Sequence, residues 1–256
     1  MYRAYKLEGE IDFPEGSLEA GIELRKTSAK FVEVALKEFV SGGKIDGSRL
    51  RDHWFKEVKA DIFISHSHLD QDIAVSLAGW LHETFALKAF IDSTVWGYST
   101  DLLRDLDDEF APNHDGTAYD YATRNVTTSH VHMMLATSLS RMMDVTECAI
   151  FVSTPNSVSH SKGSDALVDS PWIFYELDQL SILRRKEPVR TVKKASIEEN
   201  FASKDPHIPI RYKANFESLT PLGENGLVKW VENWRDPAQE GTELEHLYRI
   251  PYIELI

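Results

Sequence analysis

The sequence has a single cysteine, Cys148, among its 256 residues. One thiol cannot form an internal disulfide, so a secreted fold held by disulfides is excluded and a reducing compartment is expected. No window approaches the roughly 18 uncharged apolar residues of a membrane-spanning helix, and the first residues lack the apolar core of a signal peptide. We therefore expect a soluble, cytoplasmic protein that does not enter a membrane.

Positive charge is also scarce. The chain has 28 lysine and arginine residues against 41 aspartate and glutamate residues, which gives a formal net charge of −13. Binding to nucleic acid or to an anionic membrane depends on clustered lysine and arginine, so neither is an expected partner. Only 184–194 is locally basic, and its simplest interpretation is a helix end followed by a solvated loop.

Several well-known catalytic patterns are missing from the sequence. It contains no Gly-x-Ser-x-Gly, no Walker phosphate loop and no Gly-x-Gly-x-x-Gly. Cys148 opens an apolar run and has no evident histidine partner, so we expect a buried thiol rather than a nucleophile. The length and the 42% hydrophobic content predict one substantial core with smaller additions.

Short apolar runs alternate with helical patterns in the middle of the chain. The runs at 60–65, 87–92 and 147–153 are too continuously apolar to be half exposed, which is typical of buried strands. Residues 71–85 have apolar side chains every four positions, and a methionine-rich helix is expected over 129–143. Because parallel neighbours need crossover connections, this alternation predicts an α/β fold with a parallel, doubly wound sheet.

The pattern predicts additions on both sides of this core. An amphipathic helix over 17–40 indicates an N-terminal helical extension, which we place at 1–58, before a main domain at 59–235. We expect a loop over 187–207. The tail at 236–256 is too apolar to be freely solvated, so it should pack back on the domain.

The longest break in the pattern covers residues 93–128. This stretch contains Trp96, Tyr98, an acidic segment and a polar Pro-Asn-His-Asp-Gly sequence, and we predict a long loop inserted in the main domain. A loop of this length in a compact domain is usually a functional lid or a disordered insertion. Its aromatic residues favour a lid that closes over a ligand.

The motif His66-Ser67-His68-Leu69-Asp70 directly follows the first apolar run. Two imidazoles and a carboxylate at this spacing could bind a metal, as in metallo-β-lactamase-like hydrolases. However, Gln71 stands where that motif needs a histidine, and no downstream segment supplies the remaining ligands. The competing interpretations are a ligand-binding loop at the carboxyl end of a parallel strand and a simple surface turn.

A second motif is Ser170-Pro171-Trp172-Ile173-Phe174-Tyr175-Glu176-Leu177. Serine at the N-cap and proline at the first helical position predict a helix over 171–185. Trp172 and Glu176 are four residues apart and share a face of this helix, which places an apolar wall beside a carboxylate. Taken alone, the pair also fits a chance spacing on a solvated helix.

Four elements follow one another in a specific order: Phe63-Ile64-Ser65 with Ser67 and Asp70, Ala89-Phe90-Ile91-Asp92, Ile150-Phe151-Val152-Ser153, and Ser170-x-Trp172 with Glu176-Leu177. This order resembles a Toll/interleukin-1 receptor (TIR) domain from about residue 60 to 186, with a fainter continuation to Trp234. The resemblance implies a flavodoxin-like sheet of about five strands. The long stretch after Asp92 and the helical segment before the domain depart from the family pattern.

For bacterial members of this family the resemblance also implies cleavage of NAD+, with Glu176 as the catalytic glutamate and no cofactor or metal. The implied substrate-binding residues are Ser65, His66, Ser67, Asp92, Trp96, Tyr98 and Trp172. The product would be a free, cyclic or conjugated ADP-ribose that signals to a separate effector, as in anti-phage defence of the Thoeris kind.

The resemblance leaves a second class of function open. A TIR domain can act as a non-catalytic scaffold or adaptor that assembles with copies of itself or with other TIR domains, here through the stretch after Asp92. A metal-dependent hydrolase that uses His66, His68 and Asp70 is the third alternative.

Overall fold

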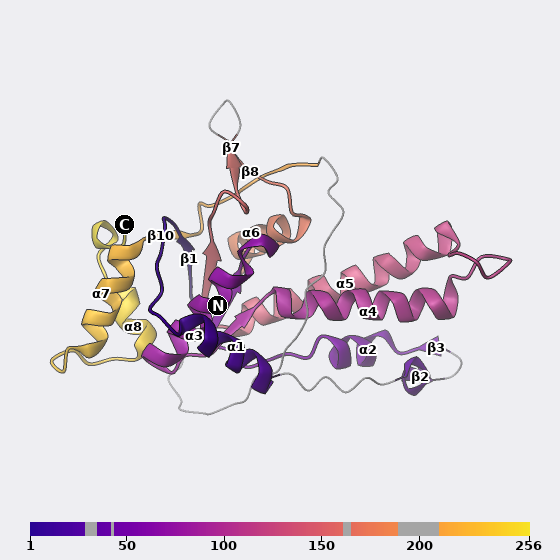
Figure 1. The fold of residues 1–256 in the computed structure, drawn as a ribbon, viewed down its shortest axis with the longest axis horizontal. Coiled ribbons are helices and arrows are strands. Elements are labelled where there is room, and N and C mark those ends of the chain that lie inside the picture. Colours follow the sequence, from indigo (N-terminus) through magenta and orange to yellow (C-terminus); the bar gives the residue numbers. More distant parts are fainter. Residues whose placement is uncertain (29–34, 42–43, 161–164, 189–209) are drawn as a thin grey trace.

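A computed structural model describes residues 1–28, 35–41, 44–160, 165–188 and 210–256 (Figure 1). The side chains of 26–28, 41 and 94–97 also lie outside this description. The described part is an α/β fold in which helices flank a five-stranded parallel sheet. This architecture confirms the predicted flavodoxin-like fold class.

The central sheet has the order β10-β1-β6-β4-β5, and every neighbouring pair is parallel. Its strands are β1 (Arg3–Leu7), β4 (Ile62–Ser65), β5 (Ala89–Ile91), β6 (Cys148–Val152) and β10 (Thr220–Leu222). The neighbours β5, β4 and β6 have the 2-1-3 arrangement of a doubly wound sheet. Sheets of this kind bind ligands outside the carboxyl ends of the strands, where the strand order reverses.

The two faces of the sheet pack into two separate cores, because successive residues of a strand point to opposite sides. Ile62 and Ile64 of β4 enter one core, and Phe63 enters the other. The isoleucine side is covered by α3 (Gln71–Phe85), α7 (Glu224–Arg235) and α8 (Glu243–Tyr248). The phenylalanine side is covered by α2 (Gly47–Trp54), α4 (Ser93–Phe110), α5 (Tyr121–Val145) and α6 (Pro171–Ile182).

Helix α1 (Ser17–Ser28) packs on α3 at very short distance. A Cβ atom at Gly79 of α3 would lie 2.0 Å from the backbone oxygen of Ser17, and one at Gly21 of α1 would lie 2.1 Å from that of Val75. No side chain can occupy such a space. The two helices therefore approach this closely only because both contact positions are glycine.

Strand β1 lies within 1–58, where a helical extension was predicted. It lies inside the sheet and pairs with β6 from Arg3↔Cys148 to Leu7↔Val152, and with β10 on its other side. Tyr5 is completely buried. The segment 1–58 is thus joined to the sheet of the main domain, and the predicted boundary near residue 58 does not separate two folding units.

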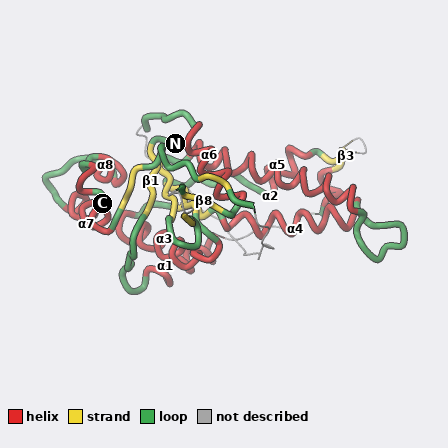
Figure 2. Tube along the Cα trace, turned by 90° about the horizontal axis from the view of Figure 1, so that it is seen from above, coloured by secondary structure: helices red, strands yellow, loops and turns green. Residues whose placement is uncertain are grey.

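Residues 93–128 are not a loop, so this prediction is wrong. Helix α4 covers Ser93–Phe110 and α5 begins at Tyr121, eight residues before the predicted start of the methionine-rich helix. Leu102 and Leu106 bury one side of α4, and α4 packs along α5. Figures 1 and 2 show the two helices side by side, projecting from the sheet as a long hairpin, which we call the arm.

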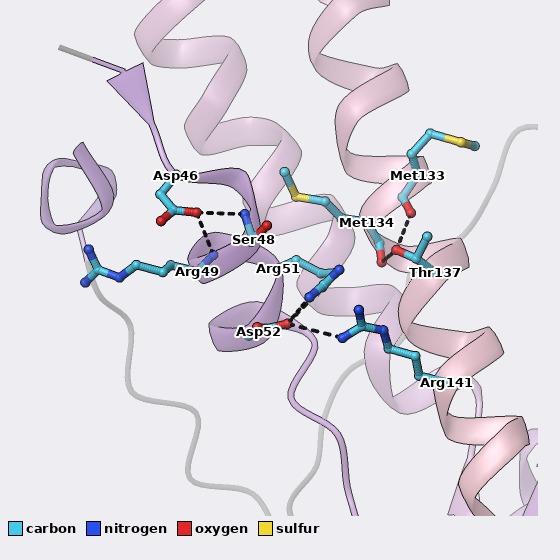
Figure 3. A network of polar contacts seen from close by, with 9 residues as sticks. All are labelled: Asp46, Ser48, Arg49, Arg51, Asp52, Met133, Met134, Thr137 and Arg141. Carbon is cyan, nitrogen blue, oxygen red and sulfur yellow. Dashed lines mark hydrogen bonds and ion pairs between the residues drawn. The ribbon is translucent and has the colours of Figure 1, made fainter. Parts of the chain in front are cut away.

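Helix α2 braces the arm from one side (Figure 3). Asp46 caps α2 by accepting hydrogen bonds from the backbone nitrogens of Ser48 (3.0 Å) and Arg49 (3.1 Å). The Asp52 carboxylate lies 3.9 Å from an Nη atom of Arg141 on α5. Leu50 and Trp54 bury the other side of α2 in the core beneath the arm.

The remaining described elements are short. The predicted helix over 17–40 ends at Ser28; residues 29–34 lie outside the described part, and η1 (Leu36–Phe39) and the hairpin β2 (Val40–Ser41) with β3 (Lys44–Ile45) follow. A small antiparallel sheet contains β7 (Ser159–His160), β8 (Ala166–Val168) and β9 (Tyr212–Lys213). The short helices η2 (His68–Asp70) and η3 (Tyr252–Glu254) complete the set. Most of the predicted loop at 187–207 falls outside the described residues.

The tail at 236–256 packs on the domain as predicted. Leu244, Leu247, Ile250 and Leu255 are buried in the core on the α3 and α7 side. Within the described ranges, no helix combines the length and the apolar character that crossing a bilayer requires.

Candidate functional site

Two strand ends bring polar side chains to one point at the carboxyl edge of the sheet. Phe63 of β4 pairs with Phe90 of β5, and both face the core that α6 covers. Ser65 and Asp92 follow two residues later on the two chains, so the alternation of side chains turns both toward α6. Both residues are buried, at 1% and 0% exposure.

Helix α6 supplies the third member, Glu176. Its first turn forms as predicted: Ser170 is the N-cap, its hydroxyl accepts a hydrogen bond from the backbone nitrogen of Ile173, and Pro171 occupies the first turn. Ile173, Leu177 and Leu180 bury the same side of the helix as Glu176. The Glu176 carboxyl is completely buried, and Ser65 Oγ donates a hydrogen bond of 2.6 Å to its Oε2 atom.

His66 and Asp92 form a second contact at the same edge. His66 Nδ1 lies 2.6 Å from Asp92 Oδ1, and neither side chain has exposed surface. At this separation a proton lies between the two atoms, donated either by the imidazole or by the protonated carboxyl. Asp92 Oδ1 also accepts a hydrogen bond of 2.7 Å from the backbone nitrogen of Ser93, so the same carboxyl caps the first residue of the arm.

Burial shifts the protonation of all three ionisable groups. It raises the pKa of Glu176 well above its usual range, and the neighbouring Asp92 carboxyl raises it further. Burial also raises the pKa of Asp92 to about 7, and it lowers the pKa of His66 to about 4. Desolvation always favours the uncharged form. The site therefore holds a neutral imidazole and two carboxyl groups that share a proton near neutral pH.

This arrangement concentrates about one negative charge in a dry site. Such a carboxylate can stabilise a positive charge that develops on a bound molecule, and the second carboxyl can take up a proton. Because Glu176 and Asp92 have no exposed surface, a ligand reaches them only when the side chains that cover them are displaced.

A third polar contact at this edge was not predicted from the sequence. The Asp70 side chain accepts hydrogen bonds from Thr154 Oγ1 (2.6 Å) and Asn156 Nδ2 (2.7 Å), in the turn that follows β6. Asp70 is the residue before α3, but its side chain caps no helical nitrogen. The signal that could have found Thr154 and Asn156 is their position just after a buried strand.

The other predicted substrate-binding residues lie at different distances from this centre. Ser67 is 9% exposed in the turn after β4. Trp172 is half buried on α6, and its indole meets the His132 ring of α5 edge-on at 5.4 Å between centroids. Tyr98 packs against the core from α4. Trp96 belongs to α4, but its side chain lies outside the described part.

The proposed metal ligands are not assembled into a metal site. His66 faces Asp92, and Asp70 is bound by Thr154 and Asn156. In the described ranges, no three His, Cys, Asp or Glu side chains group so that they could hold a metal ion. Cys148 is buried at the start of β6 and burial raises its pKa, as expected for a thiol in an apolar core.

No protein-family model, no curated protein and no solved structure matches this chain. The function of the site is therefore inferred from its residues and their geometry.

Proposed function

We propose that the protein cleaves the bond between nicotinamide and ribose in NAD+, with Glu176 as the catalytic carboxylate. The observation that carries this proposal is the convergence of Ser65, Asp92 and Glu176 at the carboxyl edge of the parallel sheet. These are three of the residues that the resemblance to a TIR domain implies for the active site. Trp172, one turn before Glu176, would form an adjacent wall for the substrate.

The reaction suits a site with one negative charge. The electron pair of the C–N bond leaves with the pyridinium ring, which departs as neutral nicotinamide, so no proton has to be delivered to the leaving group. The remaining demand is to stabilise positive charge on the anomeric carbon, which a fixed and desolvated carboxylate does well. Ordinary glycosides need a second carboxyl to protonate the leaving oxygen.

Glu176 and Asp92 would let the charge of the site adjust to the substrate. NAD+ brings a positive pyridinium, which would lower the pKa of Glu176 and favour its ionised form. Asp92 can then hold the shared proton or accept the one that the attacking nucleophile loses. His66, with its pKa lowered, would stay neutral and support Asp92 rather than compete for negative charge.

The buried state of Glu176 bears on regulation. Because a substrate can enter only after a displacement, the proposed enzyme would be largely inactive until a trigger opens the site. Exclusion of water would then decide which nucleophile captures the ribosyl cation. A cyclic or conjugated ADP-ribose would serve as a messenger to a separate effector, as proposed for anti-phage defence of the Thoeris kind.

Glu176→Gln tests the proposal. The purified chain is incubated with NAD+, alone and with candidate activators, and nicotinamide release is followed by chromatography. Wild type should release nicotinamide, and Glu176→Gln should reduce the rate at least about 100-fold, because the amide cannot balance the developing charge. Asp178→Asn, an exposed carboxyl on the same helix, is the matched control and should leave the rate unchanged. No release under any condition, or equal rates for wild type and Glu176→Gln, would refute the proposal.

A non-catalytic scaffold is the second candidate, and the projecting arm with its exposed end favours it. Under this alternative the chain acts by assembly alone. Glu176→Gln would then keep every cellular phenotype, whereas changes at the end of the arm would remove it.

A further inference from the structure

A groove lies on the isoleucine side of the sheet, opposite the side that α6 covers. It has a volume of about 420 Å³ and is bounded by the segment 11–14, by α3 and by α7. Figures 1 and 2 show α7 at the end of the molecule opposite the arm. Among the described residues, its lining includes none from the arm or from α6. A groove of this volume is in the range that binds small molecules, and a ligand here would not compete for the proposed catalytic site.

The floor of the groove is aromatic and aliphatic. Trp80 of α3 is 8% exposed, and its ring is fixed by edge-on contacts with Phe85 (5.3 Å between centroids) and Trp230 (5.8 Å). Phe13 approaches the same indole at 6.0 Å from the segment 11–14. The aliphatic part of the lining comes from Ile11, Leu227, Val228 and Val231. Walls that are already fixed lose little entropy when a compact apolar group binds to them.

Carboxylates outnumber cations around this floor. Asp12, Glu224 and Glu232 line the groove together with one arginine, Arg235. Glu232 lies 3.3 Å from Lys229, but Asp12 and Glu224 have no ion-pair partner in the described part of the chain. Arg235 follows Glu224 by about 16 Å along α7, so the two side chains leave the helix at opposite ends of the groove.

The segment that borders the groove adds negative charge. Residues 8–19 contain no lysine or arginine and five acidic residues: Glu8, Glu10, Asp12, Glu15 and Glu19. The backbone nitrogen of Glu8 donates a hydrogen bond of 3.0 Å to the oxygen of Leu222, which holds the segment beside the start of α7. The groove therefore has a negative potential, which attracts a cation and repels an anion.

We propose that this groove binds a small organic cation, in which an ammonium group is attached to one aromatic or compact aliphatic body. The body would lie on Trp80 and Leu227, and the ammonium would face Asp12 and Glu224. The rings of the floor add to the attraction, because an ammonium within about 6 Å of an aromatic ring is stabilised by the charge distribution of that ring. An anion would instead face the carboxylates. The inference does not depend on NAD+ cleavage.

An NMR titration of the nitrogen-15-labelled chain with 2-phenylethylammonium tests this site. The chain has six tryptophans, and the indole signal of Trp80 is identified as the one that is absent from Trp80→Phe. The probe should shift this signal saturably, with a Kd of about 1–10 mM for a ligand of this size. As the matched control ligand, 3-phenylpropionate has the same ring and a negative charge, and it should bind at least about tenfold more weakly.

Two double variants separate a specific contact from the effect of overall charge. Asp12→Asn with Glu224→Gln removes the unpaired carboxylates of the groove and should weaken the binding of 2-phenylethylammonium about five- to tenfold, through the loss of two partly exposed ion pairs. Glu10→Gln with Glu15→Gln changes the net charge equally, at exposed positions of the same segment that do not line the groove. This control should keep the affinity within about twofold at physiological salt, where distant exposed charges are screened.

Val228→Lys tests the position of the site independently. Val228 lines the groove and is 53% exposed, and lysine is a good helix former, so the variant should fold and its own ammonium should weaken the binding of the probe at least about fivefold. Circular dichroism of each variant shows whether it is folded. A Trp80 signal that does not shift, equal affinities for the two probes, or folded Asp12/Glu224 and Val228 variants that bind like wild type would each overturn the proposal.

Discussion

Ser65 and Asp92 reach Glu176 because each follows, by two positions, a phenylalanine that faces α6. Their alternation in the two paired strands places one hydroxyl and one carboxyl on the same side of the sheet. A shift of one residue in either strand would turn that side chain into the opposite core. The chemistry of the site thus depends on strand register as much as on residue type.

Asp92→Asn should change how stability depends on pH. The folded state holds the Asp92 proton up to about pH 7, whereas the unfolded chain releases it near its ordinary pKa of 3.8. Stability is therefore lost as pH rises from about 4 to 7, in total by about 2–4 kcal/mol. Asparagine cannot ionise and removes this loss. The free energy of unfolding of Asp92→Asn minus that of wild type should therefore increase between pH 4.5 and 7.5 in urea titrations.

The titration of His66 changes stability with pH in the opposite direction to that of Asp92. The pKa of His66 is lowered to about 4 in the folded state, so the unfolded chain binds more protons between about pH 4 and 6.5 and stability rises with pH there. Wild type combines the two opposing trends, and Asp92→Asn should leave the histidine trend exposed. Asp178→Asn should follow wild type at every pH. A constant difference between Asp92→Asn and wild type would contradict the raised pKa.

The central site was predicted from the order of four motifs rather than from single residues, and its periphery was not predicted. Ser65, Asp92 and Glu176 each stand beside a buried strand end or a capped helix start, which alone does not assign a role; the resemblance to a TIR domain implied one site for them, and the structure brings these three together. Thr154 and Asn156 also follow a buried strand, which could have marked their position, but their contact with Asp70 could not be predicted because it is formed by the tertiary structure.

Helices and strands were predicted where their apolar periodicity was strong. They were missed where charged residues interrupted that periodicity. The strands at β4, β5 and β6 and the helices α3 and α6 were found within a few residues of their ends. Strand β1 was missed because Arg3 and Lys6 break its apolar run. Helix α4 was predicted to be a loop because its acidic residues and Gly97 hide an apolar stripe, which packs against α5 and α2 in the structure.

The contact between α1 and α3 gives a prediction at the level of elements. Gly79→Ala would place a methyl group 2.0 Å from the Ser17 oxygen, a backbone atom that cannot move without shifting α1. We expect a loss of roughly 2–4 kcal/mol in the free energy of unfolding, since overpacking of this kind strains the backbone. Gly47→Ala is the matched control, because its new methyl would lie 3.4 Å from the flexible end of Met134. Equal stabilities for the two variants in urea titrations would show that α1 does not pack on α3.

At the level of the whole molecule, strand β1 links distant parts of the chain, because it pairs with β6 on one side and with β10 on the other. The 2-1-3 order of β5, β4 and β6 comes from consecutive strands, but the next place in the sheet belongs to the N-terminal strand, with β10 beyond it. The sheet on which α6 places Glu176 therefore needs residues from both ends of the described chain. The arm, in contrast, projects from this body (Figure 2), and its buried residues, such as Leu102 and Val131, belong to the core on the phenylalanine side of the sheet.

This division predicts opposite outcomes for two deletions. Removing residues 2–8 takes away β1, exposes the inner edges of β6 and β10 and opens both cores, so cooperative unfolding should be lost. Replacing residues 109–122 with a short glycine-rich loop removes only the end of the arm and should keep a cooperative transition, with the Asp107–Thr127 contact still in place. Thermal unfolding followed by circular dichroism compares the two. A cooperative transition after deletion of residues 2–8 would mean that the segment from residue 59 folds by itself, and that β1 is an addition to the sheet rather than a part of its core.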